Sequence, residues 1–120
     1  MKFTNDEMLR SIMMMRDLHE TGKLGYAIAR NMRKMTDASK EFMDIREQLL
    51  QKYGTDTGDG KYTISSDNAI AFSREISEYS EIEHDVDVFC VDEDTFTSGD
   101  LDSQQMYVLE WMVSPKEDVS

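Results

Sequence analysis

The chain has 120 residues and 39% of them are hydrophobic, enough for one folded domain, yet no apolar run approaches the roughly 18 residues that cross a bilayer. Its net charge of −12 is concentrated in residues 54–120, which hold three Lys and Arg against seventeen Asp and Glu, whereas residues 1–53 hold ten against eight. An acidic surface of this kind excludes nucleic acid and anionic membranes as partners and favours basic proteins or cations.

The first predicted element is a helix that begins after Thr4. Thr4 can cap this helix, and Glu7, three residues later, completes a capping box. Phe3 before the cap can pack on Met8 as a hydrophobic staple. We expect Gly22 to end the helix in a left-handed conformation.

A second helix is predicted from Leu24 to Tyr53. Its core-facing residues recur every seven positions in two rows: Ile28, Met35, Phe42 and Leu49, and Leu24, Asn31, Ala38 and Ile45. The rows form a coiled-coil-like seam. A helix of about 45 Å is longer than the first helix can cover, so the rest of the seam packs either on the C-terminal half of the chain or on a second copy. For a homodimer, the residues expected at the contact are Ile28, Asn31, Met35 and Phe42, because an inward asparagine often fixes a partner's register.

Seven of the ten methionines lie between Met8 and Met43, including three in succession at residues 13–15. Three successive helical residues point in three directions, so they cannot all face one buried stripe. Two interpretations follow. The methionines fill an adaptable core, or they form a plastic protein-binding surface.

Residues 55–60 predict a turn-rich linker that leads into a short strand at 61–65. The linker does not fit a calcium-binding EF-hand loop, because Thr55, Thr57 and Ser66 stand where carboxylates belong. A third helix is predicted from a cap at Ser66 or Asp67 to about Ser80.

Residues 82–91 alternate between two kinds of side chain, which predicts a half-buried strand. One side carries His84, Val86, Val88 and Cys90, and the other carries Glu83, Asp85, Asp87 and Phe89. Residues 92–100 are expected to form a loop, and a short last helix is expected between a Ser103 cap and Pro115. The predicted order is α-α-β-α-β-α. The fold class is α+β with helix dominant: residues 1–120 form a single domain in which 1–53 is a long helical hairpin and 54–120 is a small acidic α/β portion.

The sequence lacks the residue combinations that mark an enzyme or a cofactor site. It has no phosphate-binding glycine loop, no CxxC pair and no serine nucleophile elbow. Cys90 on an inward strand position is more often a small buried hydrophobe than a reactive thiol. Asp85 and Asp87, with Asp92 and Asp94, could gather a divalent cation, but no second element supplies convergent acids. We therefore expect a protein that is not an enzyme and needs neither metal nor cofactor.

Three segments in chain order resemble a pattern found in small uncharacterised proteins of tailed phages and prophages. They are GKLGYAIARN at residues 22–31, LLQKYG at 49–54 and YVLEWM at 107–112. The resemblance implies an accessory protein made in the cytoplasm of a bacterial host, which agrees with a single cysteine that cannot form an internal disulfide. It carries no catalytic residues to this chain.

Small acidic phage proteins include inhibitors of host defence, among them anti-CRISPR proteins that present carboxylates where phosphates would lie in Lys- and Arg-lined grooves. We therefore expect the chain to bind and inhibit a host nucleic-acid-handling protein that has a basic channel or groove. The residues expected to bind it are Glu83, Asp85, Asp87, Asp92, Glu93 and Asp94. The alternative is a phage assembly or accessory protein that acts through the Met-rich helical hairpin, with the acidic strand serving only solubility.

Overall fold

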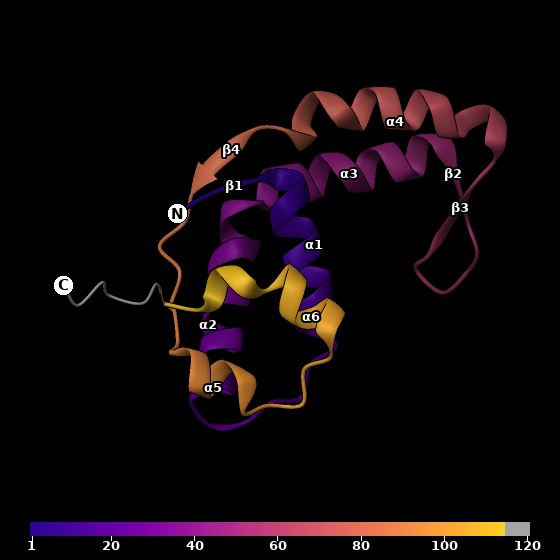
Figure 1. The fold of residues 1–120 in the computed structure, drawn as a ribbon. Helices are drawn as coiled ribbons and strands as arrows, with labels where there is room; N and C mark the ends of the chain where they lie inside the picture. The colour runs from indigo at the N-terminus through magenta and orange to yellow at the C-terminus, as the bar shows by residue number, and fades with distance from the viewer. Residues whose placement is uncertain (115–120) are drawn as a thin grey trace.

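The computed structural model of the protein describes residues 1–114 and shows helices joined by two small antiparallel sheets (Figure 1). The fold is α+β with helix dominant, as predicted. The elements are β1 (Lys2–Thr4), α1 (Asn5–Arg16), α2 (Gly22–Ala38), α3 (Lys40–Tyr53), β2 (Gly54–Asp56), β3 (Tyr62–Ile64), α4 (Ser66–Ser80), β4 (Glu83–Asp85), α5 (Glu93–Thr97), α6 (Ser103–Val108) and the 3₁₀ helix η1 (Glu110–Met112). None of the helices in residues 1–114 is long and apolar enough to cross a membrane.

The start of α1 confirms the predicted capping box. The Glu7 backbone N–H donates to Thr4 Oγ1 at 3.1 Å, and the Thr4 N–H donates to Glu7 Oε1 at 2.9 Å. The prediction that Gly22 ends this helix is wrong. The backbone at Asp17 closes α1 after Arg16, and Gly22, with a φ of +67°, instead turns the following loop into α2.

The single helix predicted from Leu24 to Tyr53 is in fact two helices, α2 and α3, separated at Ser39. The buried hydroxyl of Ser39 donates to the Met35 carbonyl at 2.7 Å. A serine that bonds back to the carbonyl four residues earlier competes with the helix ladder and often bends the helix. In Figure 1, α3 accordingly runs across the direction of α2 and leaves the rest of the bundle.

The predicted seam is covered along both helices, fully in its first row and partly in its second, where Ala38 and Ile45 are half-buried. Its first row is covered throughout: Ile28, Met35, Phe42 and Leu49 are all buried. The C-terminal half supplies the cover over α2, where Leu24, Ile28 and Met35 share one core cluster with Val86, Val91, Phe96, Leu101, Leu109 and Met112. Along α3 the cover is α4. Of the two partners considered for the seam, the structure therefore shows the chain's own C-terminal half.

The four residues expected at a homodimer contact are covered within the chain itself. Ile28, Asn31, Met35 and Phe42 are 5%, 0%, 0% and 4% exposed within the chain itself. Asn31 does fix a register, but between two segments of its own chain, α2 and the segment that contains Phe89. Its Oδ1 accepts the Phe89 N–H at 2.7 Å, and its Nδ2 donates to the Phe89 carbonyl at 2.8 Å. The amide of Asn31 thus pairs with the Phe89 backbone much as a neighbouring strand would.

The strand predicted at 82–91 is regular only over its first part, β4. Its partner β1, which the sequence did not predict, offers three residues for antiparallel pairing. Beyond β4 the backbone makes hydrogen bonds to segments other than β1. The Val86 N–H donates to the Met1 carbonyl at 2.8 Å, and the Val91 N–H donates to the Met112 carbonyl at 2.8 Å. The predicted alternation is confirmed, because exposed side chains alternate with covered ones from 83 to 90.

The segment between α3 and α4 is a short hairpin. The strand predicted at 61–65 is β3, and it pairs with β2, which was not predicted. The turn between them has positive φ at Gly58 and Gly60, a conformation that glycine adopts without strain. The N-cap of α4 is Ser65, one residue before Ser66, which was the earlier of the two predicted caps. α4 packs along α3, and the hairpin lies at the far end of this pair of helices (Figure 1), which makes the molecule 55 Å long and 29 × 23 Å across.

The loop predicted at 92–100 contains a short helix, α5. The Asp92 carboxylate caps it. Five residues are too few to show a helical period in the sequence, which explains why α5 was not predicted. The last helix, α6, has Asp102 rather than Ser103 as its cap. Pro115, expected to end this helix, lies outside the described residues.

Candidate functional site

The residues predicted to bind a partner lie along a segment that runs from β4 to α5 on the outside of the molecule (Figure 1). We call these six exposed carboxylates the acidic edge: Glu83, Asp85, Asp87, Asp92, Glu93 and Asp94. The backbone that carries them is bonded to β1, to the Met1 carbonyl and to the Asn31 side chain. The acidic edge therefore projects from a backbone that the rest of the chain holds at several points.

Asp85 and Asp92 of the acidic edge also make contacts within the chain. The N-terminal ammonium of Met1 lies 2.9 Å from Asp85 Oδ1 and holds the pKa of Asp85 below its usual value. Asp92 accepts the Thr95 N–H at 3.0 Å as the cap of α5, and hydrogen bonds from Thr95 likewise lower the pKa of Asp92. Both groups are therefore negatively charged at neutral pH.

Lys34 contacts the acidic edge at Asp87. Its Nζ donates to the Asp87 carbonyl at 2.8 Å and lies 3.3 Å from Asp87 Oδ2. The Asp87 side chain is 97% exposed, so this ion pair is screened by water and weak. The Asp87 carboxylate thus stays accessible to a cation on another molecule.

The acids considered for a divalent cation do not form a metal site in the part of the chain described. No three His, Cys, Asp or Glu side chains in residues 1–114 are arranged to hold a metal ion. Cys90 is half-buried, and its Sγ lies 3.7 Å from the Trp111 carbonyl oxygen.

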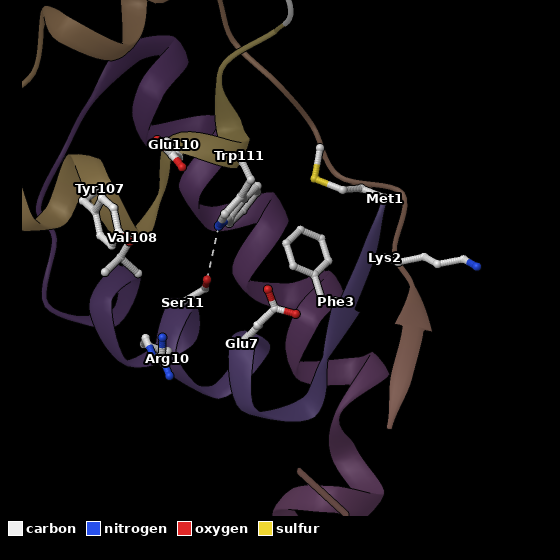
Figure 2. Close-up of a pocket in the computed structure, with 10 residues that line it drawn as sticks. All are labelled: Met1, Lys2, Phe3, Glu7, Arg10, Ser11, Tyr107, Val108, Glu110 and Trp111. Carbon is white, nitrogen blue, oxygen red and sulfur yellow. Dashed lines mark hydrogen bonds between the residues drawn. The ribbon is translucent and has the colours of Figure 1, made fainter. Parts of the chain in front are cut away.

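A hollow of about 570 Å³ lies between the N-terminal β1–α1 segment and the C-terminal helices (Figure 2). Its lining residues are Met1, Lys2, Phe3, Glu7, Arg10, Ser11, Tyr107, Val108, Glu110 and Trp111. The Trp111 Nε1–H donates to Ser11 Oγ at 3.2 Å, and the Trp111 and Phe3 rings pack edge to face with centroids 5.3 Å apart. The Ser11 hydroxyl thus accepts from the indole, Glu7 belongs to the capping box, and Lys2, Arg10 and Glu110 add charged side chains to the lining.

Sequence reasoning did not find this hollow, because it joins two ends of the chain that are far apart in sequence. Phe3 was assigned to a local staple with Met8, and Trp111 was not assigned a partner. The single tryptophan of the chain was the available signal. A tryptophan usually buries much of its ring while its N–H finds an acceptor.

The Met-rich helical hairpin faces mostly inward. Met8, Met15 and Met35 are buried, and Met14, Met32 and Met43 are half-buried. Met13 is the member of this set that is exposed, at 47%. The arrangement agrees with methionine as core filler and leaves little of a methionine surface for a partner.

The fold and these surfaces together define a helix-dominated α+β protein with an acidic edge on its outside. Comparison of the chain with protein-family models, with curated proteins and with solved structures finds no match. The resemblance to small phage proteins stays a prediction from the sequence motifs.

Proposed function

We propose that the protein binds a host nucleic-acid-handling protein through the acidic edge and inhibits it by occupying a basic channel or groove. The observation that carries the proposal is the combination of a fixed backbone and outward carboxylates at 83–94. In an extended chain, alternate side chains are about 6.6–6.8 Å apart. Glu83, Asp85 and Asp87 therefore form a row of like charges, as the phosphates of a nucleic-acid strand do.

The physical basis of binding is charge pairing on a surface that needs little ordering. Grooves that hold nucleic acid are lined with Lys and Arg, and arginine pairs with carboxylates through two parallel hydrogen bonds. Because the backbone of the acidic edge is held at several points by β1, Met1 and Asn31, fewer degrees of freedom are lost on binding than for a free loop. No catalytic step is required, so one copy can inhibit one target. Because the sequence motifs resemble those of phage proteins, we propose that the target is a bacterial defence effector such as a CRISPR complex.

The alternative of an assembly or accessory protein is less well supported, because the Met-rich hairpin on which it depends faces inward. An acidic edge that serves only solubility also explains the charge. This second alternative differs from the proposal in one respect: solubility depends on total charge, whereas a binding surface depends on where the charge lies.

A pair of matched triple variants tests this difference. Glu83→Gln/Asp87→Asn/Asp94→Asn neutralises part of the acidic edge and spares Asp85 and Asp92, which make contacts within the chain. Asp17→Asn/Glu41→Gln/Asp44→Asn changes the net charge equally at exposed positions elsewhere. The wild-type protein should recover a nucleic-acid enzyme from host lysate, and that enzyme's own nucleic-acid substrate should compete for binding.

For the purified pair, the acidic-edge triple variant should raise Kd about tenfold, since three exposed charge pairs at roughly 0.2–1 kcal/mol each are lost. The affinity of the wild type should fall with rising salt, because such pairs are screened over about 8–10 Å. The control triple variant should bind like the wild type. Equal loss in both variants, or binding that ignores salt, would refute the proposal.

A further inference from the structure

An exposed aromatic pair, Tyr26 on α2 and Phe89 in the segment between β4 and α5, lies beside the acidic edge. Tyr26 and Phe89 pack edge to face with ring centroids 5.3 Å apart, yet they remain 56% and 38% exposed. The Asn31 clamp on the Phe89 backbone sets the place of the second ring. The position of the aromatic pair and that of the acidic edge therefore depend on the same contact.

Two hollows flank the aromatic pair, and Tyr26 lines both. The first, of about 270 Å³, extends from Phe89 toward the start of α5 and is also lined by Lys23, Cys90, Val91, Asp92 and Thr95. The second, of about 250 Å³, lies along α2 and is lined by Tyr26, Ala29, Arg30, Arg33 and Lys34. Both are smaller than the roughly 300–1,000 Å³ of small-molecule pockets. Their size suits single side chains of a protein partner.

Charge divides around the pair. Phe89 continues the outward row of Glu83, Asp85 and Asp87, and Asp92 borders the first hollow together with Lys23, so carboxylates outnumber the single lysine on this side. Arg30 and Arg33 border the second hollow. Protein interfaces are commonly built in this way, with aromatic side chains at the centre and charged residues at the rim.

We propose that the aromatic pair is the apolar centre of the interface whose rim is the acidic edge, and that it receives a bulky apolar side chain of the partner. The partner carries Lys or Arg on the side that meets the acidic edge and Asp or Glu on the side that meets Arg30 and Arg33. This inference rests on the proposed function, since it concerns the same partner. A single-stranded nucleic acid fits the pair less well, because Asp87 and Asp92 beside it repel phosphates.

The test removes the two rings and measures both affinity and its salt dependence. Tyr26→Ala/Phe89→Ala is compared with Met13→Ala/Tyr107→Ala, which removes two other exposed apolar side chains. Kd for the partner recovered by the wild type should rise about 30-fold or more in the first variant, as for interface hot spots. Its salt dependence should stay that of the wild type, whereas the acidic-edge triple variant should show a weaker one. If the double variant does not fold, as judged by thermal unfolding, Tyr26→Ala alone takes its place.

The outcomes separate this inference from the proposed function. Loss of binding in the acidic-edge variant alone leaves the function standing and overturns the aromatic centre. Loss in the aromatic variant alone, with no salt dependence, supports the aromatic centre as a binding site and overturns the acidic rim. Loss in neither variant overturns both. A dimer of the wild type that the aromatic variant turns into a monomer, measured by light scattering, would assign the pair to a second copy and overturn the inference. So would binding of a labelled single-stranded oligonucleotide that the aromatic variant loses.

Discussion

Replacing Asn31 with leucine removes the side chain that holds the acidic edge against α2. Asn31 is fully buried, and its amide makes two hydrogen bonds of 2.7 and 2.8 Å with the backbone of Phe89. Leucine has a similar size, so the space stays filled and the change in packing is small. What changes is that the Phe89 N–H and carbonyl lose their partners.

The expected cost follows from these two bonds. Each contributes roughly 0.5–1.5 kcal/mol, and a buried group left unpaired costs about 1–3 kcal/mol. Phe89 is partly exposed, so water can reach its backbone, and we expect a total of about 2–3 kcal/mol. A domain of this length has an unfolding free energy of about 6–18 kcal/mol. One kcal/mol shifts its melting temperature by about 3–6 °C, so the variant should melt about 10 °C lower.

Thermal unfolding followed by circular dichroism measures this shift, and hydrogen exchange at the Phe89 amide shows where the loss occurs. Asn68→Leu on α4 is a matched control, because Asn68 is exposed and donates one hydrogen bond, to the Tyr53 carbonyl at 3.1 Å. It should cost less than about 1 kcal/mol. An Asn31→Leu protein that melts within two degrees or so of the wild type, with the Phe89 amide still protected, would refute the clamp.

Two further predictions concern α2 and α5. Alanine is normally favoured over glycine in a helix by about 1 kcal/mol. At position 25, however, a Cβ would meet the Glu20 carbonyl oxygen. Gly25→Ala should therefore lower the melting temperature by several degrees. Ala29→Gly, at an exposed position of the same helix, measures the propensity alone and should cost about 1 kcal/mol; a more stable Gly25→Ala protein would contradict the contact. Hydrogen bonds from Thr95 hold the pKa of Asp92 below its usual value in the folded protein. The charged carboxylate therefore stabilises the fold at pH values above the unfolded pKa of about 3.9. This contribution to stability is lost as pH falls through the folded pKa. Asp92→Asn should therefore melt below the wild type at pH 7, and the gap should close as pH is lowered past about 4; a gap that does not depend on pH would contradict the assignment.

Part of the candidate site could be read from the sequence. The alternation at 83–90 indicated which side chains face outward, and all six carboxylates of the acidic edge are exposed. The same alternation placed Phe89 on the outward side, which was a signal for an exposed aromatic. Its contact with Tyr26 had no signal, because the two residues are far apart in the chain and meet only through the fold.

The elements that depend on near neighbours were determined by the sequence itself. The capping box needs Thr4 and Glu7 three residues apart, and the seam needs a repeat of seven, so each is complete within a few turns of helix. Solvent exposure along an extended segment likewise follows from a period of two residues. These patterns therefore predicted the start of α1, the buried faces of α2 and α3, and the acidic edge.

Only the tertiary structure decided which distant groups satisfy each other. β4 is three residues long because its partner β1 is three residues long. Beyond β4, the backbone of Phe89 is held by Asn31, which lies on α2 more than fifty residues earlier in the chain. Such pairings are selected by the energy of the whole packed chain, in which a buried polar group takes whichever partner the fold brings within reach.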